Sequence, residues 1–150
     1  MIRVQTQDFD IGAEIAALRA GRTDAGAIVA FVGTVREMAK KGAITAMTLE
    51  HYPGMTEKEL ERIEAEARER WPLLDCLVVH RIGRLAPGDN IVLVVPLSTH
   101  RQAAFEAAEF LMDYLKCNAP FWKTEETAEG NHWVAAKDSD EADAQRWAKL

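Results

Sequence analysis

Basic side chains at the ends of predicted elements are the residues best suited to chemistry in this chain. Arg36 follows an apolar strand, and Lys116 ends an apolar helix. His100 and Arg101 would begin that same helix, where unpaired backbone amides and the helix dipole favour an anion. Lys123 follows two aromatic residues. A lysine desolvated by such neighbours loses basicity and can serve as a general base, a general acid or an amine nucleophile.

Structural explanations compete with these functional ones. A lysine at a helix C-terminus usually makes only a favourable contact with the helix dipole, and a histidine at a helix start is more often a hydrogen-bonding residue than a catalyst. Cys117 follows Lys116, whose charge could lower the thiol pKa, but a small buried apolar residue is the better interpretation of one cysteine. The residue types alone therefore predict an anion site at most, and no reaction.

Several familiar catalytic patterns are absent from the sequence. It contains no phosphate-binding glycine loop, no dinucleotide fingerprint, no H-E-x-x-H and no C-x-x-C. The four histidines, His51, His80, His100 and His132, lack close metal-ligand spacing. We therefore expect no metal site and no cofactor.

Length and composition limit the class of protein. A chain of 150 residues suits one domain spanning residues 1–150. Its net charge of −6 argues against non-specific binding to nucleic acid or to an anionic membrane. Its apolar runs are far shorter than the roughly 18 residues of a membrane span, and its beginning does not read as a signal peptide. Because two cysteines make no disulfide framework, we expect a cytoplasmic protein.

Hydrophobic periodicity predicts alternating strands and helices. Strands are expected at 2–5, 27–35, 44–52, 76–82, 90–97, 121–127 and 132–137, and helices at 11–20, 56–70, 99–116 and 139–147. Thr56 and Thr99 each begin a segment of capping-box form, and 36–43 reads as a basic, mobile loop. The helix at 99–116 has a wide apolar stripe that includes Phe105, which predicts burial on more than one side. Hairpin-length connections favour an α+β domain.

Longer strings of residues resemble a known family. The strongest string is His100-Arg101-x-x-Ala104-Phe105, continuing to Met112-Asp113-Tyr114-Leu115-Lys116 and Ala119-Pro120-Phe121-Trp122-Lys123. Others are Leu49-Glu50-His51-Tyr52-Pro53-Gly54-Met55-Thr56-Glu57, Phe31-x-Gly33-x-Val35-Arg36, and His80-Arg81-Ile82-Gly83 followed by Pro87-Gly88-Asp89. Together, over residues 25–147, they are similar to the catalytic (large) subunit of molybdopterin synthase.

The resemblance implies a fold, an activity and partners. The fold is an α+β domain of the α/β-hammerhead type, with a mainly antiparallel sheet and interleaved helices. The activity is that of a sulfurtransferase of molybdenum cofactor biosynthesis, which converts cyclic pyranopterin monophosphate to molybdopterin. Two sulfurs arrive as the C-terminal Gly-Gly thiocarboxylate of a small ubiquitin-like sulfur-carrier subunit. One carrier binds at each end of a homodimer, which makes a heterotetramer. Substrate and carrier tail are both anions, which suits fixed basic residues.

Site residues are carried over position by position. Lys116 matches the family's principal catalytic lysine, and Lys123 matches the second. The substrate-binding residues are then Thr34, Val35, Arg36, His100, Arg101, Lys116, Lys123, Thr124 and Glu125. Lys137 stands where the family carries an arginine, so the charge is kept but the bidentate fork is lost and its role stays open. A non-catalytic anion- or peptide-binding module of the same fold is the alternative, although such a binder would not need Lys116.

Helix geometry adds a constraint that does not depend on the family. The 16 residues that separate His100 from Lys116 span about 24 Å of unbroken helix at 1.5 Å per residue. Both side chains of one chain therefore cannot touch one small pterin phosphate. We expect a two-fold dimer in which each pocket takes Lys116 and Lys123 from one chain, and His100 and Arg101 from the other.

Overall fold

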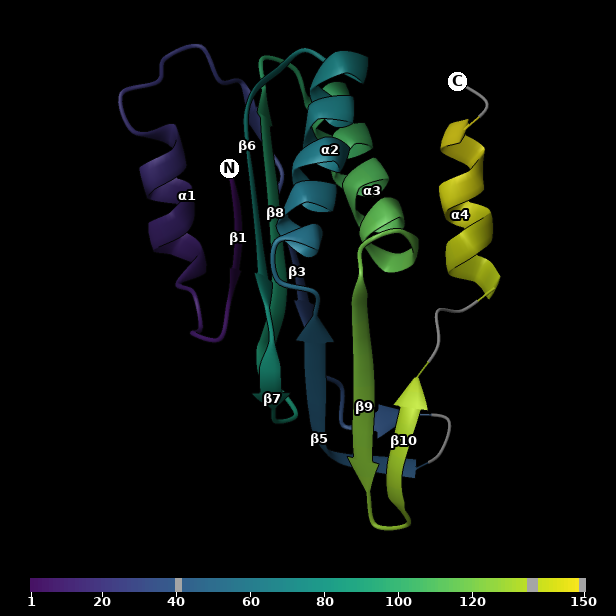
Figure 1. The fold of residues 1–150 in the computed structure, drawn as a ribbon. Coiled ribbons are helices and arrows are strands. Elements are labelled where there is room, and N and C mark those ends of the chain that lie inside the picture. Colours follow the sequence, from purple (N-terminus) through teal and green to yellow (C-terminus); the bar gives the residue numbers. More distant parts are fainter. Residues whose placement is uncertain (40–41, 135–137, 149–150) are drawn as a thin grey trace.

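A computed structural model describes residues 1–39, 42–134 and 138–148, without the side chains of 138–140. Its elements are β1 (Ile2–Gln5), α1 (Ile11–Arg19), β2 (Ala27–Ile28), β3 (Phe31–Thr34), β4 (Met38–Ala39), β5 (Gly42–His51), α2 (Met55–Arg70), β6 (Leu73–Arg81), β7 (Gly83–Leu85), β8 (Asn90–Ser98), α3 (Arg101–Cys117), β9 (Phe121–Thr127), β10 (Gly130–Val134) and α4 (Asp138–Ala148). Figure 1 shows α2 and α3 side by side over one sheet, with β9 running from the end of α3 into a second sheet.

The first sheet is covered on both faces. Its strands follow the order β1-β6-β8-β2, and β3 also pairs with β8. Val78 and Val94 face the core beneath α2 and α3, whereas Leu77 and Val95 face α1. Coverage of both faces explains why β6 and β8 are almost continuously apolar instead of alternating.

The second sheet extends from the end of α3. Its order is β10-β9-β5-β4, and β7 also pairs with β5. β5 and β9 pair antiparallel from Ile44 opposite Thr127 to His51 opposite Phe121. With β1 and β6 as the parallel pair and the other pairings antiparallel in the described residues, the predicted α+β class with a mainly antiparallel sheet is confirmed.

The prediction of one strand at 27–35 was wrong, because this segment forms two short strands, β2 and β3, that both pair with β8. β2 pairs with Leu97 and Ser98, whereas β3 pairs with β8 from Val94 down to Asn90. Between them, the Val29 N–H donates to the carbonyl of Pro96 at 3.3 Å. Because Pro96 has no N–H to return, the ladder is interrupted there.

The prediction of a loop at 36–43 was wrong in part. Met38 and Ala39 form β4 and pair with Ala43 and Gly42 at the start of β5. The basic residues between these strands, at 40 and 41, lie outside the described residues.

The capping box predicted at Thr56 is displaced, and α3 has His100 as its N-cap without a side-chain hydrogen bond instead of the box predicted at Thr99. α2 begins one residue before Thr56, and the Glu57 carboxylate accepts the Gly54 N–H at 2.6 Å. Gly54 has φ +85°, so glycine suits this cap. The Thr56 hydroxyl instead accepts the Tyr52 N–H at 3.1 Å and donates to the Pro120 carbonyl at 3.3 Å. The Thr56 hydroxyl thereby links the start of α2 to the segment before β9.

The prediction of a buried apolar stripe along α3 was wrong at the N-terminal end of the helix. His100, not Thr99, is the N-cap, and Phe105 is 61% exposed. The buried positions further along include Phe110, Leu111 and Leu115. α3 nevertheless runs unbroken from Arg101 to Cys117, as the sequence predicted.

α4 packs against α3 and completes the core. The Trp147 indole N–H donates to Asp113 of α3 at 2.6 Å, and its ring lies edge-on to Trp71 and Phe110. Figure 1 shows α4 on the outer side of α3. No helix in the described part of the chain is long and apolar enough to cross a membrane.

Candidate active site at the junction of α3 and β9

Lys116 and Lys123 lie on either side of a short junction. α3 ends at Cys117 and is capped by Asn118, whose N–H donates to the Tyr114 carbonyl at 2.8 Å, and β9 begins at Phe121. Lys116 occupies the last turn of α3, where the helix dipole favours a cation. Its side chain is exposed, so the desolvation expected from its apolar helix is not present in a single chain, whereas Lys123 is half-buried.

Lys123 shares a face of the second sheet with a small hydrophobic cluster. It lies opposite Leu49 of β5, and residues opposite each other in a sheet project from the same face. Leu49 belongs to the buried cluster that also contains Val35, Met47 and Leu85. Val35 is thus packed against the face of the sheet that carries Lys123.

Packing of Val35 brings the predicted segment 34–36 to this face. Val35 is 3% exposed, its N–H donates to the Asp89 carbonyl at 2.9 Å, and its carbonyl accepts the Gly88 N–H at 2.8 Å. Its polar backbone groups are therefore occupied, and it holds its exposed neighbours Thr34 and Arg36 in place. The exposed Arg36 guanidinium is the group in this segment best suited to an anion.

The predicted segment 123–125 is split between two faces of its strand. Glu125 lies opposite Met47 and shares the face of Lys123. Thr124 lies opposite Thr48 and projects from the other face, because side chains alternate along a strand. Lys137, the remaining predicted position, lies outside the described residues.

His100 and Arg101 lie at the opposite end of α3 from the two lysines. Both are exposed, and His100 is the N-cap. The helix between them is unbroken, so the separation of about 24 Å expected from 1.5 Å per residue stands. Within one chain, Lys116 and Lys123 flank one junction in the sequence, and Lys123 shares a face of the second sheet with the segment at 34–36. His100 and Arg101 lie at the far end of α3.

A buried histidine beside the junction was not among the predicted site residues. His80 of β6 is 8% exposed and stacks on Phe121, with ring centroids 3.8 Å apart and planes 15° apart. Its Nδ1 lies 2.8 Å from the Arg81 carbonyl, which can only accept, so Nδ1 carries the proton. Burial lowers the pKa of His80 to about 4, and the charges of Lys116 and His51 act in the same direction.

A second histidine, His51, lies opposite Phe121 on the neighbouring strand β5. The His51 and Phe121 rings are 6.4 Å apart with planes 26° apart. His51 Nδ1 is buried without a hydrogen bond and lies 3.7 Å from a Glu57 carboxylate oxygen. Burial and ring packing of this kind depend on strands that are distant in the sequence, so no spacing rule could have found these histidines.

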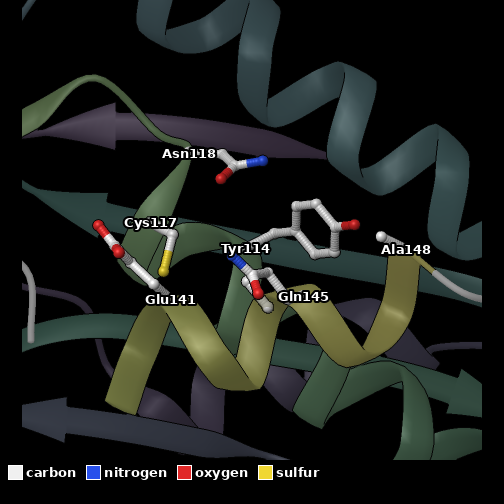
Figure 2. Close-up of a pocket in the computed structure, with 7 residues that line it drawn as sticks. Tyr114, Cys117, Asn118, Glu141, Gln145 and Ala148 are labelled. Atoms are coloured by element: carbon white, nitrogen blue, oxygen red, sulfur yellow. The ribbon is translucent and has the colours of Figure 1, made fainter. Parts of the chain in front are cut away.

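A hollow of about 340 Å³ opens between the end of α3 and α4. Figure 2 shows Tyr114, Cys117 and Asn118 facing Glu141 and Gln145 across it. None of the predicted site residues that the structure describes lines it. In the described part of the chain, no three His, Cys, Asp or Glu side chains are grouped to hold a metal ion.

Comparison with solved structures defines the class of protein. The molybdopterin biosynthesis MoaE protein from Burkholderia ambifaria superposes with a TM-score of 0.84 at 55% identity, over 99% of this chain and 97% of that one. A protein–protein complex of subunits 1 and 2 of molybdopterin-converting factor from Helicobacter pylori shares the fold, with a TM-score of 0.72 at 22% identity over 91% and 90% of the two chains. The fold is that of MoaE proteins.

Sequence comparison gives the family. The MoaE protein family model matches residues 4–118. The molybdopterin synthase catalytic subunit of Mesorhizobium japonicum is 59% identical over 148 residues, which cover 97% of this chain and 92% of that protein. The chain belongs to the MoaE family, the catalytic subunits of molybdopterin synthase, and is thus an enzyme of molybdenum cofactor biosynthesis. The resemblance stated from the sequence is confirmed.

Proposed function

We propose that this chain converts cyclic pyranopterin monophosphate to molybdopterin by inserting two sulfurs. The observation that carries the proposal is the placement of Lys116 and Lys123 around one junction in a member of this family. Lys116 and Lys123 are the catalytic residues, moving protons as a thiolate sulfur attacks and water leaves. Fixed positive charge holds the substrate phosphate, so the reaction requires no metal or other cofactor from this chain.

The sulfur is delivered by a partner. We propose a small ubiquitin-like carrier whose extended C-terminal Gly-Gly thiocarboxylate reaches the two lysines. An extended glycine-ended tail offers mainly backbone hydrogen bonds, as in other captures of strand-like peptides. The exposed side chain of Lys116 supports this, because it is accessible to an incoming anion. Neither cysteine of the chain is then required as a sulfur donor.

The complete substrate pocket spans two copies of the chain. We propose a homodimer with a carrier at each end, in which His100 and Arg101 of one protomer complete the pocket formed by Lys116 and Lys123 of the other. The unbroken α3 supports this arrangement, since it keeps these two pairs apart within one chain. Thr34, Arg36 and Glu125 line the substrate side together with Lys123, and Val35 holds its neighbours. Thr124 projects from the other face of β9 and is not part of that side.

Residues 1–150 form one domain in this proposal. One core cluster supports it, because Trp147 of α4 belongs to the cluster that contains Val78 and Phe110, and Ile2 of β1 packs against that same cluster. A reducing, cytoplasmic setting fits the chain, because Cys76 is fully buried in that same core and is not part of a disulfide framework.

The experiment combines the chain, a thiocarboxylated carrier and the pyranopterin substrate, and measures dithiolene product. Wild type should form product, whereas Lys116→Ala should form almost none while keeping its fold and its carrier binding. Lys58→Ala, which removes an exposed lysine of α2, is the matched control and should retain full activity. A carrier lacking its terminal Gly-Gly should support no turnover. Carrier or anion binding without any product from wild type would instead favour the non-catalytic binding module.

A further inference from the structure

His80 lies where the two sheets and the end of α3 meet. It belongs to β6 of the first sheet, whereas its stacking partner Phe121 begins β9 of the second. Leu115, next to Lys116, lies in the same core cluster against which Phe121 packs. The His80–Phe121 contact therefore joins the two sheets at the start of β9, at a residue that lies between the two lysines in the sequence.

Phe121 controls where the two lysines lie relative to each other. It follows Lys116 by five positions and precedes Lys123 by two, and it shares a face of β9 with Lys123. Its N–H donates to the Ala119 carbonyl at 2.8 Å, so the turn into β9 is closed at this residue. A shift of the Phe121 ring would move the start of β9 and the turn that follows Lys116.

His80 is held so that it can anchor that ring. The bond from Nδ1–H to the Arg81 carbonyl fixes the ring orientation, and 8% exposure leaves it little space to rotate. The groups that face it across the strands on either side, Val4 of β1 and Val92 of β8, carry no charge. The charged or titratable groups that act on it are Lys116 from α3 and His51 from β5, which both favour the neutral ring.

We propose that His80 is a positioning residue for the sulfur-transfer site: its neutral ring, stacked on Phe121, holds the α3–β9 junction so that Lys116 and Lys123 converge on one substrate. This inference rests on the proposed function of the two lysines. His80 itself touches neither substrate nor carrier tail and acts through Phe121. Nothing in the sequence motifs assigns it this role.

The test separates positioning from simple loss of stability. His80→Ala removes the stack, and we expect kcat to fall about 10- to 100-fold with a smaller change in KM, because misplacement of catalytic groups by about 1 Å has such effects. Val78→Ala is the matched control, since it removes a buried side chain from the same face of the same strand. It should lower the melting temperature similarly and leave kcat near that of wild type.

Two further variants keep the proposal testable if His80→Ala folds poorly. His80→Phe preserves the stack and should restore kcat to near the wild-type value. Phe121→Leu removes the stack from the other side and should lower kcat as His80→Ala does, and the double variant should be no worse than either single variant, because both remove one contact. Equal kcat for His80→Ala and Val78→Ala, or additive losses in the double variant, would overturn the proposal.

A spectroscopic measurement does not depend on turnover. The lysine side chains can be labelled with ¹³C-methyl groups and titrated by NMR, and the Lys116 and Lys123 signals should move in His80→Ala but not in Val78→Ala. Unmoved signals would overturn the positioning role. A wild-type protein that forms no product, but whose lysine signals respond as described, would instead contradict the proposed function alone.

Discussion

His80 makes the folded state sensitive to acid. Burial lowers the pKa of its imidazole from 6.5 to about 4, so between these values the unfolded chain binds a proton that the folded chain does not. The free energy of unfolding therefore falls as pH drops through this window and gains nothing above it; by pH 5 the loss is about 2 kcal/mol. In His80→Phe, which has no titratable ring at this position, this part of the fall in the free energy of unfolding should be absent. Chemical denaturation of both proteins at pH 7 and pH 5 measures it, and equal pH dependence would contradict the buried, neutral ring.

The cysteines are expected to be dispensable. Cys76 is fully buried, and burial raises the pKa of its thiol to about 12, so it carries no reactive thiolate at neutral pH. The double variant Cys76→Ala with Cys117→Ser should retain most of its activity and lose about 1 kcal/mol of stability. Product assays and thermal unfolding check both expectations. A well-folded but inactive double variant would indicate that a thiol of this chain takes part in the reaction.

Individual residues differ in how far the sequence could predict them. Lys116 and Lys123 were recognised because they stand in distinctive strings beside apolar elements, and the structure places them on one junction. The strand predicted at 121–127 already implies that Thr124 and Glu125 project from opposite faces. Only the pairing of β9 with β5 shows that Glu125, and not Thr124, shares the face of the cluster around Val35. The stack of His80 on Phe121 forms between sheets and has no local signal.

At the scale of elements, the position of the start of α3 depends on Gly26, a glycine that lies far away in the sequence. Gly26 lies just before β2, and its N–H donates to the Ser98 carbonyl at 3.1 Å. A Cβ at this position would lie 2.1 Å from the Thr99 carbonyl oxygen. Gly26→Ala must therefore displace the end of β8, at a cost of about 1–3 kcal/mol, and with it the predicted anion-binding residues His100 and Arg101.

The measurement for Gly26→Ala is thermal unfolding together with the KM for the pyranopterin substrate, which should rise. Gly12→Ala is the matched control. Its added Cβ would lie 3.5 Å from the Asp10 carboxylate, an ordinary contact within α1, and alanine is the better helix former. An unchanged melting temperature for Gly26→Ala would show that the end of β8 moves freely.

The elements were predictable where periodicity and local chemistry agree. β1, α1, α2 and α3 begin and end close to the expected positions, because their apolar spacing is regular. The division of 27–35 into β2 and β3 could not be seen, since it depends on Pro96 in the strand that both pair with. The capping box predicted at Thr56 was wrong for a related reason. The Thr56 hydroxyl accepts the Tyr52 N–H and donates to the Pro120 carbonyl, and the contact with Pro120 depends on the tertiary structure.

At the scale of the whole molecule, the length of α3 determines how a substrate site can be assembled. The helix spans Arg101–Cys117 without a break and places its basic ends about 24 Å apart at 1.5 Å per residue. A two-fold pairing of chains creates two equivalent pockets, each with groups from both protomers. The exposed Phe105, one turn from Arg101, gives this end of α3 an apolar surface for a second copy to cover.

A shared pocket predicts complementation between inactive variants. Lys116→Ala and Arg101→Ala homodimers should each be nearly inactive, because every pocket lacks one essential group. After the two are mixed and re-paired, each heterodimer contains one intact pocket and one pocket with both defects, so activity should recover to about half of the wild-type value per heterodimer. Product formation is measured after subunit exchange has been verified by mass spectrometry of differently tagged chains.

The matched control pairs two variants from the same side of the pocket. Lys116→Ala mixed with Lys123→Ala leaves one defect in each pocket of the heterodimer, because both lysines come from one protomer, so no activity should return. Recovery in this control would show that the two lysines serve different pockets, and the junction of α3 and β9 would not be one site. Absence of recovery in the Lys116→Ala and Arg101→Ala mixture, with exchange verified, would mean that His100 and Arg101 act elsewhere than in the partner's pocket.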